Sequence, residues 1–204
     1  MPVRRQAIAL LLTLGGALVG LTACGGVSLD TIRADVGAGH GHLLTGVPFV
    51  PQTEYQCGPA ALAMVLQYHG LRVSQDEIAE ALAIPSLRGT LNLDLERYAR
   101  RRGWQAQAFP GTLARAKEEL QRGRPLIVFQ DLGAPPLYPV PHFAVLVGYD
   151  DRAQAVVLHS GTTAYRVTSY ADFERTWARQ RGWSLLVTPA GDGAEAPGRR
   201  SRVA

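Results

Sequence analysis

An unusually apolar segment, residues 57–68 with the sequence CGPAALAMVLQY, constrains the fold most strongly. Its side chains are apolar on most faces of a helix, whereas a surface helix carries a single apolar stripe. The segment therefore predicts a helix that lies in the interior of a domain. Gly70, which comes shortly after it, is typical of a helix end.

Three further helices are predicted before residue 125. Ser74 and Glu77 form a capping box, S-x-x-E, which opens a helix that runs to about residue 83. Residues 93–102 repeat apolar side chains at helical spacing, and Thr112 caps a helix that runs to residue 122. Each of these last two segments is followed by a glycine, which indicates a helix end.

Short apolar runs dominate the second half of the chain and predict strands. The predicted strands cover residues 126–129, 143–147, 155–158, 165–167 and 184–187, with a helix over 170–179 between the last two. Helices followed by antiparallel strands indicate an α+β fold in which N-terminal helices pack on an antiparallel sheet.

Length and charge exclude several classes of protein. With 204 residues, 47% of them hydrophobic, the chain has enough apolar material for one domain and is short for two. Its formal net charge is +4, but Arg4, Arg5 and three arginines after residue 198 lie near the chain ends. No basic stripe with interleaved aromatic residues remains, so nucleic acid is not an expected partner.

The N-terminal residues resemble a secretion signal. A short positive stretch is followed by the apolar residues 7–21, which glycines interrupt, and then by Leu21-Thr22-Ala23-Cys24. These four residues resemble a bacterial lipobox. That resemblance implies a signal peptide over residues 1–23, acylation of Cys24, and anchoring in the cell envelope at the outer membrane, facing the periplasm. The alternative is an ordinary cleaved signal with a chance cysteine.

Composition predicts the remaining boundaries. The glycine-rich residues 24–45 are expected to form a lipid-anchored flexible tether, and residues 190–204, which lack apolar periodicity, a disordered tail. The folded domain is then expected over residues 46–189. His40 and His42 in the tether could bind a metal weakly, but a plain linker is the preferred interpretation.

Cys57 is the candidate nucleophile. The chain has two cysteines, and acylation of Cys24 would leave Cys57 as a lone thiol in an oxidising compartment. The predicted helix begins at this residue, and the unpaired N–H groups and positive dipole end of a helix N-terminus favour a thiolate. The alternative is a small buried residue, as most free cysteines are.

Two blocks of the sequence resemble the bacteriocin-processing papain-like cysteine peptidases, which cut leader peptides after a double glycine. The first block is VPFVPQTEYQCGPAALAMVLQYHG, residues 47–70, and the second is HFAVLVGYD, residues 142–150. The resemblance implies a papain-like fold, a peptide or protein substrate, and no cofactor. The chain carries no P-loop motif and no row of apolar 20-residue segments, which favours a free-standing lipoprotein member of that family.

The resemblance assigns roles to four residues. Cys57 attacks the scissile carbonyl, His142 takes and returns the proton, and Gln52 donates to the developing oxyanion. Gln52 lies five residues before Cys57, whereas the family usually has six. The family orients its histidine with an aspartate in the next strand, and His159 occupies that position here. A neutral imidazole at His159 could accept a hydrogen bond from His142, or it could be a strand-end histidine facing solvent.

Two other functions stay open at this level. A Cys-His-His site would also suit a cell-wall peptide hydrolase or an acyl transferase. A non-catalytic peptide-binding module is the third hypothesis, because the position of the usual aspartate is altered. The main expectation is a cysteine peptidase that cleaves exported peptides or proteins through an acyl-thioester on Cys57.

Overall fold

The computed structural model describes residues 27–53, 55–82, 90–134 and 138–191. The predicted signal peptide, Cys24 and all but the first two residues of the predicted C-terminal tail lie outside the described residues. The helices are α1 Leu29–Gly37, α2 Cys57–Tyr68, α3 Gln75–Leu82, α4 Asn92–Arg101, α5 Leu113–Gln121 and α6 Tyr170–Ala178. The strands are β1 Gly41–Leu43, β2 Gln105–Pro110, β3 Leu126–Asp131, β4 Pro141–Asp150, β5 Ala155–Ser160, β6 Thr163–Ser169 and β7 Trp183–Thr188.

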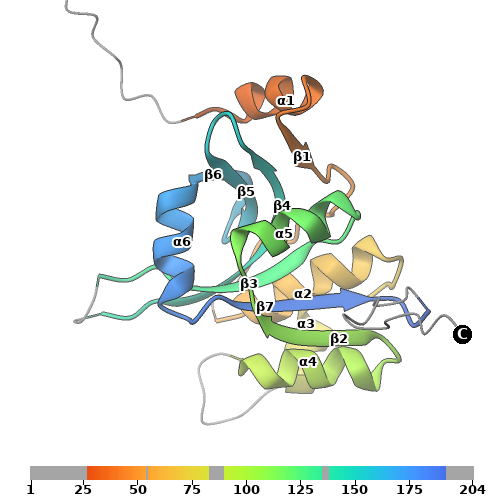
Figure 1. Cartoon of the computed structure of the whole chain (residues 1–204). Coiled ribbons are helices and arrows are strands. Elements are labelled where there is room, and N and C mark those ends of the chain that lie inside the picture. The colour runs from red at the N-terminus through yellow and green to blue at the C-terminus, as the bar shows by residue number, and fades with distance from the viewer. Residues whose placement is uncertain (1–26, 54, 83–89, 135–137, 192–204) are drawn as a thin grey trace, which may run out of the picture.

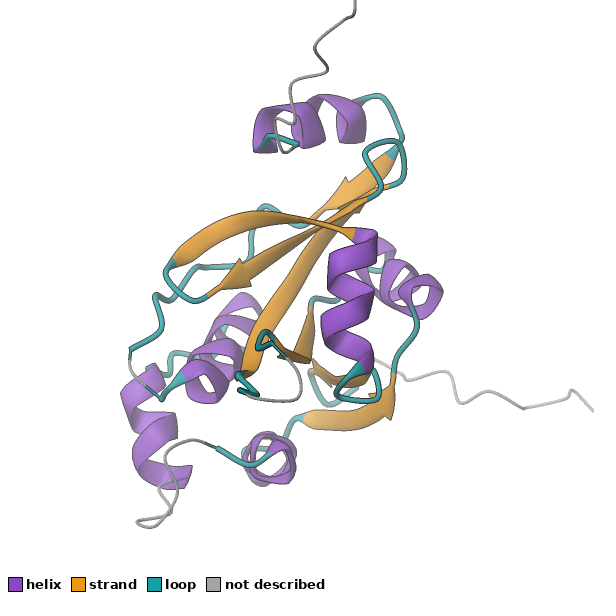
Figure 2. Cartoon of the chain, turned by 90° about the vertical axis from the view of Figure 1, so that its left-hand side faces the viewer, coloured by secondary structure: helices purple, strands orange, loops and turns teal. Residues whose placement is uncertain are grey.

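A seven-stranded antiparallel sheet forms the centre of the fold (Figure 1). Its strands run in the order β2-β7-β3-β4-β5-β6, and β1 pairs with the second half of β4. Helices lie on both sides of this sheet (Figure 2). The predicted α+β class, with helices packed on an antiparallel sheet, is confirmed.

The two faces of the sheet carry different helices. Phe129 and Phe143 face each other across β3 and β4, and their rings stack at 4.4 Å on the face that α2 covers. Gln130, the next residue along β3, bonds to Thr176 of α6 at 2.7 Å. Because successive strand residues point to opposite faces, α2 and α6 lie on opposite sides of the sheet.

α2 is the buried helix that its sequence predicts. Every residue from Gly58 to Leu66 is buried, against β4 and β3 on one side and α3 and α4 on the other. Gly70 adopts a φ of +91° just beyond the helix end, a conformation that glycine adopts without strain. The capping box that opens α3 is present in both directions, since Glu77 N–H donates to Ser74 Oγ and Ser74 N–H donates to Glu77 Oε2.

The prediction of a flexible tether over residues 24–45 is wrong for residues 29–43. Residues 29–37 form α1, whose Ile32 is fully buried in the core, and residues 41–43 form β1. Gly41 is packed so tightly against β4 that an added Cβ would lie 2.1 Å from the carbonyl oxygen of Tyr149. Glycine here therefore permits a close approach of two strands, whereas composition alone suggests a linker.

No helix in the described ranges is long and apolar enough to cross a membrane.

Candidate active site

Cys57 is the first residue of α2 and is partly exposed, in contrast to the buried residues that follow it. Gln56 precedes the helix and makes no side-chain capping bond, so no side chain of the N-cap residue occupies the first turn. The positive end of the helix dipole therefore acts on the thiol. This placement agrees with the position that the sequence predicts for the nucleophile.

His142 is the second residue of β4 and is half-buried. Its partner across β3 is Gln130, which places the imidazole on the α6 face of the sheet. The ring nitrogen Nε2 lies 2.9 Å from Ser160 Oγ at the end of β5. Burial, together with the positive charge of Arg166 on β6, lowers the pKa of His142 from 6.5 to about 4.

Gln52 ties the loop before α2 to the strands that carry the imidazole. Its side-chain Nε2 donates to the carbonyl oxygen of Phe143 at 3.1 Å, and its backbone N–H donates to the carbonyl oxygen of Gly161 at 3.0 Å. These acceptors are the residues directly after His142 and Ser160. One N–H of the amide is left over, since a glutamine side chain has two donors.

The start of α2 lies directly against the start of β4. A Cβ added to Gly58 would meet the ring of Phe143 at 3.4 Å. Each of these two residues follows a candidate, Cys57 in one case and His142 in the other. Thus the structure brings together the segments that carry Cys57, His142 and Gln52, although 85 residues separate the first two in sequence.

His159 is not part of this arrangement, contrary to its predicted role as the partner of His142. Its Nε2 lies 3.1 Å from the carbonyl oxygen of Val47, and its Nδ1 accepts from the N–H of Tyr165 at 3.1 Å. The side chain is fully buried on the α2 face, because His159 is paired with Val145 in register. A difference of one residue along a strand changes the face, so Ser160 and not His159 reaches His142.

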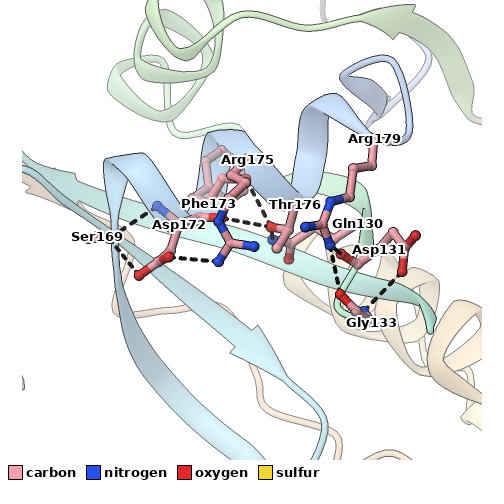
Figure 3. A network of polar contacts seen from close by, with 9 residues as sticks. All are labelled: Gln130, Asp131, Gly133, Ser169, Asp172, Phe173, Arg175, Thr176 and Arg179. Atoms are coloured by element: carbon pink, nitrogen blue, oxygen red, sulfur yellow. Dashed lines mark hydrogen bonds and ion pairs between the residues drawn. The ribbon is translucent and has the colours of Figure 1, made fainter. Parts of the chain in front are cut away.

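The segment between β3 and β4, which leads into His142, is held in place at its base. Asp131 Oδ1 accepts from the N–H groups of Val140 and Gly133, and these bonds lower the pKa of that carboxyl. Arg179, the residue that follows α6, donates to the carbonyl oxygens of Asp131 and Gly133 (Figure 3). The chain therefore enters β4, and hence His142, from a fixed point.

Within the described ranges, no three His, Cys, Asp or Glu side chains gather in a way that could hold a metal ion. Ser160 and Arg166 were not among the residues predicted from the sequence. The signal that could have found Ser160 is the alternation of β5, once Val145 and His159 are known to be paired. For Arg166 the sequence holds no comparable signal, because β6 is largely exposed and lacks a clear apolar period.

Comparison with known proteins supports one family. The model of the Peptidase C39-like family matches residues 44–185. A candidate C39-like peptidase from Bacillus anthracis has a similar structure, with a TM-score of 0.60 and 18% identity, over 74% of this chain and 98% of that one. No curated protein matches the chain in sequence.

Two transporter peptidases have the same fold. The peptidase domain of Streptococcus ComA, a bifunctional ABC transporter of a quorum-sensing pathway, gives a TM-score of 0.55 and 20% identity over 71% of this chain and 99% of that one. A double glycine motif protease from an AMS/PCAT transporter was solved in complex with the leader peptide. It gives a TM-score of 0.53 and 22% identity over 74% of this chain and 99% of that one. At these sequence identities, the structural similarity shows a shared fold alone.

Proposed function

The chain belongs to the Peptidase C39-like family, and on this premise we propose that it is a cysteine peptidase that cleaves exported peptides or proteins. The observation that carries the proposal is the contact between the start of α2 and the start of β4. A cysteine at a helix N-terminus and a half-buried histidine flank that contact, as Cys57 and His142 do. Nucleophilic catalysis by a thiol needs such a base nearby.

The side chain of His142 leaves β4 on the α6 face and α2 packs on the other face, so the proposed reaction brings the thiol and the imidazole together around the start of β4. In this reaction, Cys57 Sγ bonds to the scissile carbonyl carbon while its proton passes to His142. The oxyanion that forms takes hydrogen bonds from the backbone N–H of Cys57 and from the remaining amide N–H of Gln52. The C–N bond then breaks as His142 gives its proton to the leaving amine. Water adds to the thioester, its proton returns to sulfur through His142, and the C–S bond breaks.

An extended peptide with apolar side chains fits the surroundings of the site. Large apolar side chains are exposed on the segment before Cys57, at the start of α4, and between β3 and β4. These side chains are Tyr55, Leu91, Leu93, Leu132, Tyr138 and Val140. The start of α4 adjoins the site, because Thr90 would lie 3.2 Å from a Cβ on Gly58. The related protease solved with a leader peptide supports a peptide as the substrate class.

We also propose that Cys24 carries a lipid that anchors the protein in the cell envelope. The support is the lipobox-like sequence before Cys24. The full chain should partition into the detergent phase, and Cys24→Ser should move it to the aqueous phase. Retention of the unsubstituted chain in the aqueous phase would exclude the anchor.

The Cys-His-His alternative loses its motive, because both ring nitrogens of His159 bind backbone groups on the opposite face of the sheet. The peptide-binding module remains the competing outcome of the decisive test. That test is alkylation of Cys57 by iodoacetamide in the full chain, followed on the peptide that contains Cys57, with the denatured chain as the reference thiol. His142→Ala removes the base, and His40→Ala, at an exposed histidine, is the matched control.

We expect native Cys57 to react faster at pH 7 than the denatured thiol, and His142→Ala to remove the excess while His40→Ala does not. A structural buried thiol would be inert. If Cys57 reacts no faster than the denatured thiol and its alkylation rate does not change in His142→Ala, the peptidase proposal fails and the binding module takes its place.

A further inference from the structure

His142 has one side-chain partner in the described part of the chain, and it is a hydroxyl. Nε2 of the imidazole lies 2.9 Å from Ser160 Oγ. Gln130, the direct neighbour of His142 in β3, is already bonded to Thr176. Asp131, the nearest carboxylate along that strand, accepts from two backbone N–H groups.

We propose that Ser160 is the positioning residue of the site, whose hydroxyl accepts the Nε2–H of His142 and leaves Nδ1 as the nitrogen that takes the thiol proton. The proposal rests on the proposed function and deepens it. A neutral histidine carries its proton on one nitrogen alone, so an acceptor at Nε2 fixes the tautomer as well as the ring orientation.

Ser160 is itself held in place. It is 6% exposed and ends β5, where the β5–β6 register shifts between Leu158 and Ser160. Such a bulge can re-aim a side chain. Gly161, with a φ of +62°, turns the chain next, and its carbonyl oxygen accepts the backbone N–H of Gln52. The loop that carries the proposed oxyanion donor thus fixes the turn that carries the serine.

The charges around His142 determine how a hydroxyl partner affects the pKa of the imidazole. Arg166 acts on the ring from β6, while Asp172 and Arg175 of α6 pair with each other at 2.7 Å (Figure 3). On β5, His159 faces the other side of the sheet. Burial and Arg166 lower the pKa of His142 to about 4, and a neutral hydroxyl does not oppose this as a carboxylate would.

An uncharged imidazole follows at neutral pH. The thiol proton then moves to Nδ1 as sulfur attacks, and the Nε2–H bond to Ser160 persists through proton uptake and release. A neutral imidazole does not hold a thiolate by charge, so we expect the alkylation of Cys57 to decline as the pH falls from 7 to 5 and the thiolate becomes protonated.

The test compares Ser160→Ala, Ser160→Thr and Ser160→Asp in the full chain, with Thr162→Ala in the exposed turn as the matched control. The first readout is NMR of the His142 ring, which reports its tautomer and pKa without any reaction. The second is the rate of Cys57 alkylation between pH 5 and pH 9.

We expect Ser160→Ala to mix the tautomers and slow alkylation at pH 7 by about three- to tenfold, the worth of one neutral hydrogen bond. Ser160→Thr should keep the wild-type behaviour. Ser160→Asp should raise the pKa of His142 by about one unit or more and preserve alkylation at pH 5. Thr162→Ala should change neither readout.

The two proposals fail in different ways. If Ser160→Ala leaves the tautomer, the pKa and the alkylation rate unchanged, the positioning role is overturned even when Cys57 is reactive. If the ring responds to the substitutions but Cys57 is inert in every variant, Ser160 holds the ring and the peptidase proposal is the one that falls.

Discussion

The side-chain amide of Gln52 donates a hydrogen bond of 3.1 Å to the carbonyl oxygen of Phe143, the residue that follows His142. This bond orients the amide at the junction of α2 and β4 and leaves its second N–H for a ligand. An oxyanion donor is most effective when it is held in place before the reaction.

Gln52→Ala should therefore lower kcat for hydrolysis of a fluorogenic peptide by about 10²-fold, with a much smaller effect on KM. The matched control is Gln75→Ala. Gln75 donates to the carbonyl oxygen of Pro51 in the same loop but belongs to α3 and not to the contact between α2 and β4, so kcat should not change. Equal losses in the two variants would mean that loop anchoring explains the effect and that Gln52 is no oxyanion donor.

Stability should depend on pH through His142. Its pKa is near 6.5 in the unfolded chain and about 4 in the native one, so the unfolded state binds the proton first as pH falls. The free energy of unfolding should thus decrease between about pH 6.5 and pH 4, by up to about 3 kcal/mol. Urea unfolding of wild type, His142→Gln and His40→Gln at pH 5 and pH 7 checks this.

In that experiment His142→Gln should show the smaller pH dependence, and His40→Gln should match wild type. His159 contributes in the same direction, because burial lowers its pKa also. A slope that is identical in wild type and His142→Gln would show that His142 titrates normally in the native state.

Two glycines in the N-terminal segment distinguish a folded strand from a tether. A Cβ at Gly41 would clash with β4 at 2.1 Å, whereas one at Gly37 would meet nothing within 4 Å. We expect Gly41→Ala to destabilise the protein by about 1 to 3 kcal/mol through overpacking. Gly37→Ala, at the end of α1, should be neutral or stabilise by about 0.5 kcal/mol. Thermal unfolding measures both, and equal melting temperatures would contradict the pairing of β1 with β4.

The exposed apolar side chains around the site should contribute to substrate binding and not to the stability of the fold. Tyr138 is 75% exposed and Leu93 is 50% exposed. Tyr138→Ser and Leu93→Ser should raise KM for an apolar peptide several-fold and leave the melting temperature within about 2 °C of wild type, as for most surface changes. Leu29→Ser on the distant α1 provides a comparison for KM alone. An unchanged KM in both site variants would place the peptide elsewhere.

Much of the fold could be predicted from local patterns. The limits of α2 agree with the apolar run, because a buried helix can be recognised by apolar side chains on every face. By contrast, β2 has one buried residue, Ala106, and therefore no apolar period to detect. β1 consists of three residues, and its glycine serves a contact with Tyr149 that lies more than 100 residues away.

The candidate site, like the fold, has some residues that sequence patterns identify and others that depend on long-range strand pairing. Cys57, His142 and Gln52 could be found from motif resemblance, and the structure brings their segments together. The partner of His142 could not, because strand register decides between His159 and Ser160 and no local signal fixes that register. The bulge at the end of β5 adds a further shift that alternation by itself does not predict.

The early start of α1 limits how far the folded domain could lie from a lipid on Cys24. α1 begins at Leu29, so four residues separate it from Cys24, and this stretch spans at most about 17 Å when extended. The tether predicted from composition would span up to about 75 Å. With the proposed lipid on Cys24, the folded domain would lie close to the surface of the bilayer, and the proposed peptidase would act on chains that emerge from or lie on that membrane and not on those that diffuse away from it.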